Sequence, residues 1–562
     1  MRPRRFGTAE LLLLLSILIL VVVVVAIPIL LIFWNAFVVE GKPDFLRALA
    51  LLKEPDTLEA LKNSLVIAGG TTVLSTIIGV FFAWLVSRTD LPYKGTMKVL
   101  FLVPFMLPSF IGALAWKILL SPRGGHINRL LMDLFHLEDP VFNIMSLGGI
   151  IAVETMYLFP FVFIQVSGAL ERMDPTLEEA ARISGAGLFT ITRRITLPLM
   201  MPSILAGALL VALYSLAHFG VPAILGTERN IFIIPTKIYE KIYASGGNFE
   251  AIRTGTMLSS ILVLSAAAIL YVQSLVLSSG RFQVISGKSM RPMVLKLRGL
   301  KWPLLILSVV YIAITVVLPT VTIFLVGTLK TYGLAFKLEN MTLDNFTYIL
   351  FKWELTRDAI WNSFYLSLSA AAVTMLIGTL ISYVLVKTKI RGKFLLEFLG
   401  VLPFSVPGTV IALGVILMWS GRFGVNLYNT AWIIFVAYIA RYMAFALKST
   451  SAALEQVHDS LEEAARACGA TKWQAMKDVV LPLIKPGMVA AFFLIFLPAL
   501  RELTTSVLLY GPHTRTIGVA IYTLNEDGET VYAAALAAIA LVIIVLGQLL
   551  IKRVTRAKIE SA

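Results

Sequence analysis

The chain has 562 residues, of which 58% are hydrophobic and only 14% are charged, and its mean hydropathy is +0.86. Soluble globular proteins are nearer half apolar and about a quarter charged, so this composition excludes a soluble globular protein and predicts an integral membrane protein. The single cysteine, Cys468, excludes an intrachain disulfide framework and a multi-thiolate metal cluster.

The net charge of +15 raises the possibility of a nucleic-acid partner, but the distribution of charge argues against one. Counting from a cytoplasmic N-terminus, basic residues gather on one side of the membrane, at Arg2, Arg4, Arg5, Arg88, Lys94, Lys98, Arg281, Lys288, Arg291, Lys296, Arg298, Lys301, Lys387, Lys389, Arg391, Lys393, Lys552, Arg553, Arg556 and Lys558. The loops on the other side mix both signs. This is the positive-inside pattern, and it predicts a multi-pass protein of the cell membrane, surrounded by lipid, with both termini cytoplasmic and no nucleic-acid partner.

Twelve apolar runs of about 20 residues predict transmembrane helices, because only helices satisfy their backbone groups within one segment in the hydrocarbon. They cover roughly 11–34, 61–87, 98–120, 147–171, 202–224, 254–278, 303–328, 360–387, 394–419, 429–452, 486–510 and 531–551. The first run exceeds the core of about 7–15 residues of a secretory signal, so we expect it to be a retained span.

The chain repeats itself. Asn63, Ser64, Gly79, Pro104 and Pro108 recur 299 residues later as Asn362, Ser363, Gly378, Pro403 and Pro407. Six spans, a linker and six more spans give both halves the same orientation, so the repeats are parallel and related by an axis along the membrane normal. We therefore predict an all-α membrane protein with two six-helix halves, 1–278 and 303–562, joined by a basic linker, 279–302.

The four repeated prolines lie in apolar runs. Proline lacks an N–H group and disfavours a helical residue before it, so these positions predict breaks or kinks in the third and ninth spans. A direct role at a gate is the alternative interpretation.

A polar loop follows the fourth span of each half, and its two copies are 284 residues apart. The shared residues are Glu178, Glu179, Ala180, Ala181 and Gly185 in the first copy, and Glu462, Glu463, Ala464, Ala465 and Gly469 in the second. Asp174 followed by Pro175 favours a helix start, as Asp459 or Ser460 does in the second copy. Glycine favours a left-handed helix end. Each loop therefore predicts a short helix with a small-residue face that another protein can approach closely.

The loops at Glu179–Pro198 and Glu463–Pro482 resemble the cytoplasmic loop of permease subunits of binding-protein-dependent ABC importers, with Val479 in place of the usual isoleucine. The resemblance extends over both halves. It implies a type I ABC importer permease fold, two coupling helices docked on two ABC ATPase subunits, and an extracytoplasmic solute-binding protein. The segments His218–Gly226 and Arg501–Leu509 are similar to fused ferric iron permeases; thiamine, phosphonate and polyamine cargoes stay open.

A nucleotide-binding loop would need Gly, four residues and then Gly-Lys-Ser/Thr. Gly287-Lys288-Ser289 comes nearest, but Phe282 occupies the position of the first glycine. We therefore predict no enzyme, no catalytic residue and no cofactor in this chain, with ATP and Mg²⁺ bound by partner ATPases.

Five ionisable residues fall in or beside predicted spans: Glu154, His218, Arg441, Arg501 and Glu502. A charge at a helix centre costs about 2.5–3.5 kcal/mol, and we expect Arg501 and Glu502 inside the eleventh span. Two interpretations stay open: an ion-pair network that fixes helix packing, or a lining of the translocation path. His218 aligns with Glu502 across the repeat, but one histidine and one glutamate are too few to predict a metal site.

Two other classes compete with the importer. An ion-coupled secondary transporter usually carries a charged motif between its second and third spans, where this chain has Arg88-Thr89-Asp90-Leu91-Pro92. It would also leave the paired loops unexplained. A respiratory or channel subunit is disfavoured because none of the five histidines is paired within a span at ligand spacing.

Overall fold

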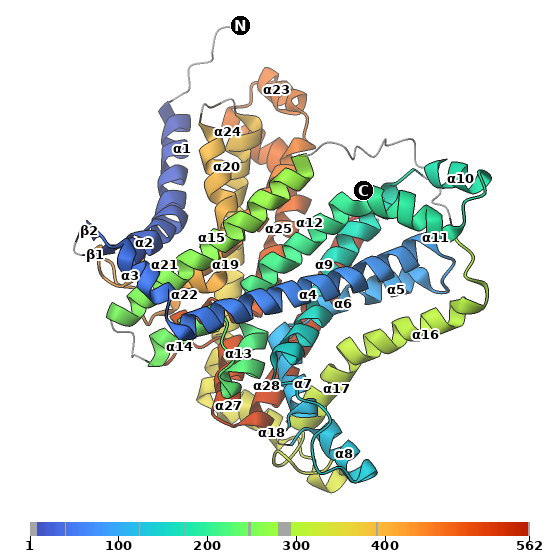
Figure 1. Cartoon of the computed structure of the whole chain (residues 1–562). Helices are drawn as coiled ribbons and strands as arrows, with labels where there is room; N and C mark the ends of the chain where they lie inside the picture. The colour runs from blue at the N-terminus through green and yellow to red at the C-terminus, as the bar shows by residue number, and fades with distance from the viewer. Residues whose placement is uncertain are drawn as a thin grey trace. The chain divides into compact units, whose positions relative to one another are not determined.

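The computed structural model describes residues 8–559, except 40, 123, 175, 245–248, 279–293, 389 and 391. Several residues used above lie outside the described part: Arg2, Arg4, Arg5, Pro175, Lys389, Arg391, and residues 279–293 of the linker with Gly287, Lys288 and Ser289. Helices dominate what is described (Figure 1), and one short antiparallel ladder joins β1 (Val38–Val39) to β2 (Lys42–Pro43).

The helices follow the two halves of the sequence. The first half contains α1 (Thr8–Val21), α2 (Ile27–Phe37), α3 (Phe45–Leu52), α4 (Pro55–Arg88), α5 (Lys94–Leu100), α6 (Val103–Met106), α7 (Ser109–Leu120), α8 (His126–Phe135), α9 (Leu147–Arg172), α10 (Thr176–Ile183), α11 (Leu188–Ile191), α12 (Leu197–Leu216), α13 (Gly220–Gly226), α14 (Ile234–Ala244) and α15 (Phe249–Ser278). The second contains α16 (Lys301–Ile312), α17 (Leu318–Gly327), α18 (Asp344–Thr347), α19 (Glu354–Lys387), α20 (Lys393–Val401), α21 (Gly408–Trp419), α22 (Ala431–Glu455), α23 (Asp459–Ala467), α24 (Lys472–Ala475), α25 (Leu481–Leu500), α26 (Ser506–Leu509), α27 (Ile517–Glu526) and α28 (Thr530–Ile559).

Short turns of other helix types join several of these elements. The π-helical segments are η1 (Val22–Ala26), η2 (Thr192–Thr196), η5 (Ala313–Val317), η7 (Tyr348–Lys352) and η9 (Met476–Val480). The 3₁₀ segments are η3 (Thr227–Arg229), η4 (Arg298–Leu300), η6 (Leu338–Asn340) and η8 (Leu402–Ser405). The segments η2 and η9 are 284 residues apart, the same spacing as the repeated polar loops.

The number of spans agrees with the prediction of twelve. Among the described residues, ten helices are long and apolar enough to cross a membrane, and two bent helix pairs bring the number to twelve if each pair counts as one span. The pairs are α5–α6 with α7, bent by 88°, and α20–η8 with α21, bent by 117°. Pro108 and Pro407 cap the second helix of each pair, so the predicted proline breaks are confirmed.

The repeat extends to individual hydrogen bonds. The Ile234 N–H donates to Ser64 Oγ at 2.9 Å, and the Ile517 N–H donates to Ser363 Oγ at 2.6 Å. In each repeat the preceding asparagine also donates its side-chain amide to a backbone carbonyl just before the short helix. Equivalent residues therefore perform the same structural task in both halves.

The compact units of the structure interleave the two halves of the sequence. Unit 1 contains residues 1–51, 238–263 and 343–562, and unit 2 contains residues 52–237 and 264–342. The helices of the first span, α1 and α2, thus belong to the unit that holds most of the second half, and α16 and α17 belong to the other. The predicted boundaries at 278 and 302 describe sequence repeats and stay predictions.

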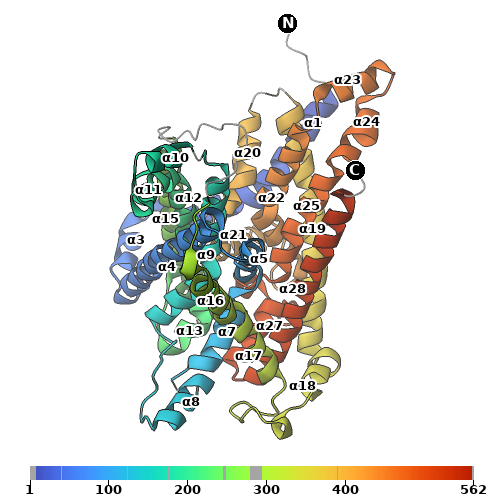
Figure 2. The ribbon, with the colours of Figure 1, turned by 90° about the vertical axis from the view of Figure 1, so that its right-hand side faces the viewer.

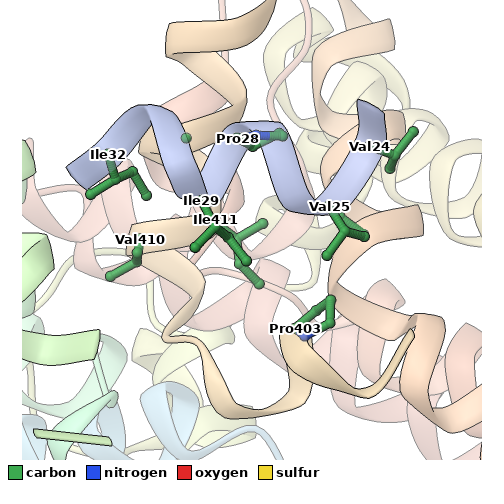
Figure 3. Close-up of a pocket in the computed structure, with 10 residues that line it drawn as sticks. Val24, Val25, Pro28, Ile29, Ile32, Pro403, Val410 and Ile411 are labelled. Carbon is green, nitrogen blue, oxygen red and sulfur yellow. The ribbon is translucent and has the colours of Figure 1, made fainter. Parts of the chain in front are cut away.

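Within unit 1, the first span packs closely on α21. Gly414 makes this possible, because a Cβ atom there would lie 2.7 Å from the Pro28 carbonyl oxygen. The two segments line a narrow apolar pocket (Figure 3), whose residues are Val24, Val25, Pro28, Ile29, Ile32, Pro403, Val410, Ile411, Gly414 and Ala440.

Within unit 2, the seventh span is tied to the loop after α4. The Asp90 carboxylate accepts a hydrogen bond from the Leu297 N–H at 2.7 Å and pairs with Lys301 Nζ at 2.7 Å. These two contacts lower the pKa of Asp90. Further along α16, the Tyr311 ring packs against Phe82 and Phe159, with ring centroids 5.0 and 5.3 Å apart.

The close contact at Gly414 gives a test of the exchanged first span. Gly414→Val should lower the thermal midpoint of the purified protein, because overpacking costs about 1–3 kcal/mol and the obstacle is backbone. Gly69→Val in α4 is the matched control, since a Cβ at Gly69 meets nothing within 4 Å. Equal midpoints for the two variants would contradict the packing of the first span on α21.

Candidate functional site

The first of the predicted short helices is α10, and both of its ends are built as the sequence indicates. The Asp174 carboxylate accepts a hydrogen bond from the Thr176 N–H at 2.9 Å. At the other end Gly185 has φ +82°, and the Ala186 N–H donates to the Ala181 carbonyl at 3.0 Å. This is a Schellman ending, in which the left-handed residue is most easily glycine.

The second short helix, α23, ends in the same way but begins differently. Gly469 has φ +93°, and the Ala470 N–H donates to the Ala465 carbonyl at 3.1 Å. The expected caps, Asp459 and Ser460, are wrong: the N-cap is His458, whose ring Nδ1 accepts from the Ser460 N–H at 3.3 Å. The imidazole takes the role that we assigned to an acidic or hydroxyl side chain.

Both helices expose a face that combines small and large apolar residues. Glu179 and Ala180 are exposed in α10, and Glu463 and Ala464 are exposed in α23. Nearby apolar side chains are also exposed, namely Leu177, Ile183 and Phe189 in the first copy and Leu461 and Trp473 in the second. Phe189 and Trp473 are equivalent under the 284-residue spacing. Clustered exposed apolar residues of this kind mark interaction surfaces.

Glu178 points the other way and fixes α10 to its own bundle. It is only 3% exposed, its Oε1 accepts a hydrogen bond from Thr196 Oγ1 at 2.6 Å, and its Oε2 lies 3.6 Å from Arg88 Nη2. Arg88 is the last residue of α4 and is 2% exposed. The prediction that this glutamate faces a partner is therefore wrong, because its charge balances a buried guanidinium at the end of a span.

The second copy is anchored by different residues. Lys387, which follows Arg88 by 299 residues and ends α19, pairs with Asp459 at 2.6 Å. Glu462 is half-buried and accepts a hydrogen bond from the Tyr383 hydroxyl at 3.4 Å. Val480 stands where the first copy has Thr196. Both short helices are thus held by the end of a 34-residue span, one through a buried pair and the other through a more exposed one.

Within unit 2, a polar group surrounds Glu154 in the middle of α9. The Glu154 carboxylate is fully buried, lies 2.9 Å from His218 Nδ1, and accepts hydrogen bonds from the hydroxyls of Ser215 and Thr71. The other ring nitrogen of His218, Nε2, lies 2.8 Å from Ser109 Oγ. This group joins α4, α7, α9 and the break that follows α12.

Within unit 1, the corresponding group surrounds Glu502. Its Oε1 lies 3.5 Å from Arg441 Nε, and the carboxylate accepts from the N–H groups of Thr505 and Ser506. Gly408 makes room for the guanidinium, because a Cβ there would lie 2.1 Å from Arg441 Nη1. Ser109 occupies the position equivalent to Gly408 in the other repeat.

The two groups exchange charge between equivalent positions. In unit 2 the acid, Glu154, is on the helix and the base, His218, is at the break; in unit 1 the base, Arg441, is on the helix and the acid, Glu502, is at the break. The expectation that Arg501 and Glu502 lie inside a helix is wrong, because α25 ends at Leu500. Carboxylates at a break can accept backbone N–H groups that a continuous helix would not offer.

The structure thus brings Glu154 together with His218, and Arg441 together with Glu502, while Arg501 is half-buried beside the second pair. The sequence analysis missed Ser109, Ser215 and Thr196 as partners, and it used Arg88 only to assign orientation. The 299-residue spacing between Arg88 and Lys387 was the available signal. In the described part of the chain, no three His, Cys, Asp or Glu residues form a group that could hold a metal ion.

The fold and these sites define a multi-pass membrane protein built from two parallel six-helix repeats, each with an exposed short helix. The chain belongs to the family of binding-protein-dependent transport system inner membrane components, whose model matches residues 75–292 and 375–559. The predicted fold class, that of an ABC importer permease, is confirmed. The chain is a transmembrane subunit of such a transport system, and a solute-binding protein is its partner.

Curated relatives extend over most of the chain. It is 28% identical over 502 residues to the ferric transport system permease protein FbpB of Actinobacillus pleuropneumoniae, which covers 88% of this chain and 71% of that protein. It is 26% identical to the Fe(3+)-transport system permease protein FbpB 2 of Haemophilus influenzae, which covers 91% and 92%. The spermidine/putrescine transport system permease protein PotB of Escherichia coli is 32% identical over 37% of this chain and 77% of its own length.

The buried anchor of α10 gives a second test. Glu178→Gln should lower the thermal midpoint, because removing one partner of a buried ion pair costs about 3–5 kcal/mol. Adding Arg88→Met should restore part of the loss, since no buried charge then lacks its partner. The neighbouring variant Glu179→Gln should leave the midpoint unchanged, because Glu179 is exposed. The same midpoint for the two single variants would argue against the anchor.

Proposed function

We propose that this chain forms the membrane pathway of an ATP-driven importer of ferric iron, and that α10 and α23 each dock on one separate ATPase subunit. The observation that carries the proposal is the pair of exposed short helices, with the same glycine ending and each attached to the end of a 34-residue span. Two such surfaces suit a motor made of two similar ATPase subunits. ATP and Mg²⁺ would be bound by those subunits, and this chain would supply no catalytic residue.

The anchors explain how a force on the short helices would reach the membrane. A displacement of α10 is transmitted through Glu178 to Arg88 and Thr196, and so to α4 and to the π-helical start of α12. A displacement of α23 is transmitted through Asp459 to Lys387 and so to α19. Tilting these spans in opposite directions would alternate the access of the pathway between the two sides of the membrane.

The same elements support an orientation. The short helices and the basic chain ends would face the cytoplasm, as the positive-inside distribution indicates. Ser64 precedes Arg88 by 24 residues of one helix, which corresponds to about 36 Å at 1.5 Å per residue. The hydrogen bond from Ile234 to Ser64 therefore belongs to the opposite side, where the binding protein would deliver its solute. In Figure 1, α23 and α27 lie at opposite ends of unit 1.

Ferric iron is the favoured cargo because the two relatives that cover most of this chain are named as ferric permeases. The polyamine permease PotB matches a shorter segment at slightly higher identity, so spermidine and putrescine are the second candidates. Thiamine and phosphonates are alternatives that share the two-halved build.

Reconstitution tests the function and the role of the short helices together. Proteoliposomes containing the chain with its ATPase subunits and binding protein should accumulate radiolabelled ferric iron only when ATP is supplied. Gly185→Val or Gly469→Val should reduce this uptake at least tenfold, because a β-branched residue in the left-handed region costs about 1–2 kcal/mol and deforms the docked end. Insertion into the membrane should be unaffected.

Gly187→Val is the matched control. A Cβ at Gly187 also meets nothing within 4 Å, but its backbone lies outside the left-handed region, so uptake should stay near the unmodified rate. Full uptake by the Gly185 and Gly469 variants would overturn the role of these helices. Iron uptake driven by an ion gradient without the ATPase would overturn the class, and ATP-driven uptake of spermidine but not iron would replace the cargo.

A further inference from the structure

Two short helices, α14 and α27, hold equivalent places in the repeats. Their first residues, Ile234 and Ile517, are bound by the equivalent serines Ser64 and Ser363. Each serine precedes the cationic end of its span by the same 24 residues, so both helices begin on the side opposite to the coupling helices. None of the described spans includes either helix. Both therefore lie where a solute from the binding protein would first meet the permease.

Tyr239 and Tyr522 are equivalent residues that touch each other. Each is the fifth residue after the serine-bound isoleucine, and their rings lie edge to face with centroids 5.9 Å apart. Equivalent residues of two repeats can meet only where the repeats themselves meet, and parallel-repeat transporters place their substrate path at that boundary. Tyr522 is 1% exposed, so the pair closes the outer side of the path.

Further oxygen-bearing side chains surround this pair. The Tyr243 ring stacks on Tyr239 with centroids 5.3 Å apart, and the hydroxyls of Tyr243 and Tyr510 form a hydrogen bond. The Glu526 carboxylate is close enough to act on both Tyr239 and Tyr522. Four phenols and a carboxylate thus converge within unit 1, from α14, α27 and the end of α26.

Charged neighbours complete the surroundings. Asp527 lies within electrostatic reach of Tyr510, and the Arg515 guanidinium lies over the Tyr510 ring at 5.7 Å. Burial, helped by the neighbouring phenols and Glu526, raises the pKa of both Tyr239 and Tyr522. The phenols are therefore protonated at neutral pH while no cation is present.

We propose that Tyr239, Tyr243, Tyr510, Tyr522 and Glu526 form a reception site for ferric ion at the outer side of the pathway. The proposal rests on the ferric cargo proposed above. Hard, highly charged cations prefer anionic oxygen ligands over nitrogen and sulfur, and phenolates with a carboxylate supply such oxygens. The rings would part as the ion arrives, and each coordinated phenol would release its proton to water. Because that proton must be displaced, the affinity is lowered, as suits a site that passes its cargo on.

Absorption spectroscopy of the purified full chain tests the site directly. Ferric ion, supplied as its nitrilotriacetate chelate, should produce the visible charge-transfer band of an iron–phenolate complex. The double variant Tyr239→Phe with Tyr522→Phe should weaken iron binding at least tenfold, and it should raise the KM for ATP-driven iron uptake. Phenylalanine preserves the ring packing, and an unchanged thermal midpoint would verify the fold.

A matched control uses a second tyrosine pair in unit 1. Tyr348 and Tyr532 have ring centroids 5.4 Å apart and do not belong to the cluster, so Tyr348→Phe with Tyr532→Phe should keep the band. A band that survives in the Tyr239 and Tyr522 variant would overturn the site. Absence of the band from a chain that does import iron would overturn the site and leave the proposed function standing, whereas absence of both band and iron uptake would overturn both.

Discussion

The attachment of each exposed short helix to the end of a 34-residue span is the constraint on which this structure depends. An eight-residue helix such as α10 is too short to be stable alone in water, so its position has to be set by the bundle. Glu178 does this in the first copy by balancing the buried Arg88 and accepting from Thr196. Because the carboxylate is used inward, Glu179 and the two alanines are left on the outer face.

The two anchors differ in strength. The pair of Arg88 and Glu178 is almost fully buried, whereas the Asp459 side chain that meets Lys387 is largely exposed. Exposed pairs contribute about 0–1 kcal/mol, and breaking buried pairs costs several times more. The first short helix is therefore the more firmly held of the two. Within unit 2, Figure 2 shows α10 and the inserted helix α8 at opposite ends of the bundle, so the extra segment of the first half lies away from the coupling surface.

The polar groups inside the spans follow a related logic. A carboxylate in the hydrocarbon is costly unless it is paired and hydrogen-bonded, and both Glu154 and Glu502 are. Each pair joins the long helix after the proline break to the point where the next span is interrupted. The exchange of acid and base between the repeats shows that the pairing is retained while the residues that provide it differ.

Much of the fold could be predicted from the sequence because the repeat and the breakers are local signals. Gly185, Gly469 and Pro407 do what their backbone preferences dictate. The inward turn of Glu178 could not be predicted, since an eight-residue pattern does not tell which face meets its own bundle. The break before Glu502 was hidden in a continuous apolar run, and the packing of α2 on α21 was hidden because hydropathy identifies spans and not their neighbours.

Site-specific photo-crosslinking tests the central claim most directly. A photoreactive side chain at Ala180 or Ala464 in the assembled transporter should capture the ATPase subunit, and one at Leu338, which is 90% exposed at the other side, should not. Capture of the ATPase from Leu338, with none from Ala180 or Ala464, would contradict the account.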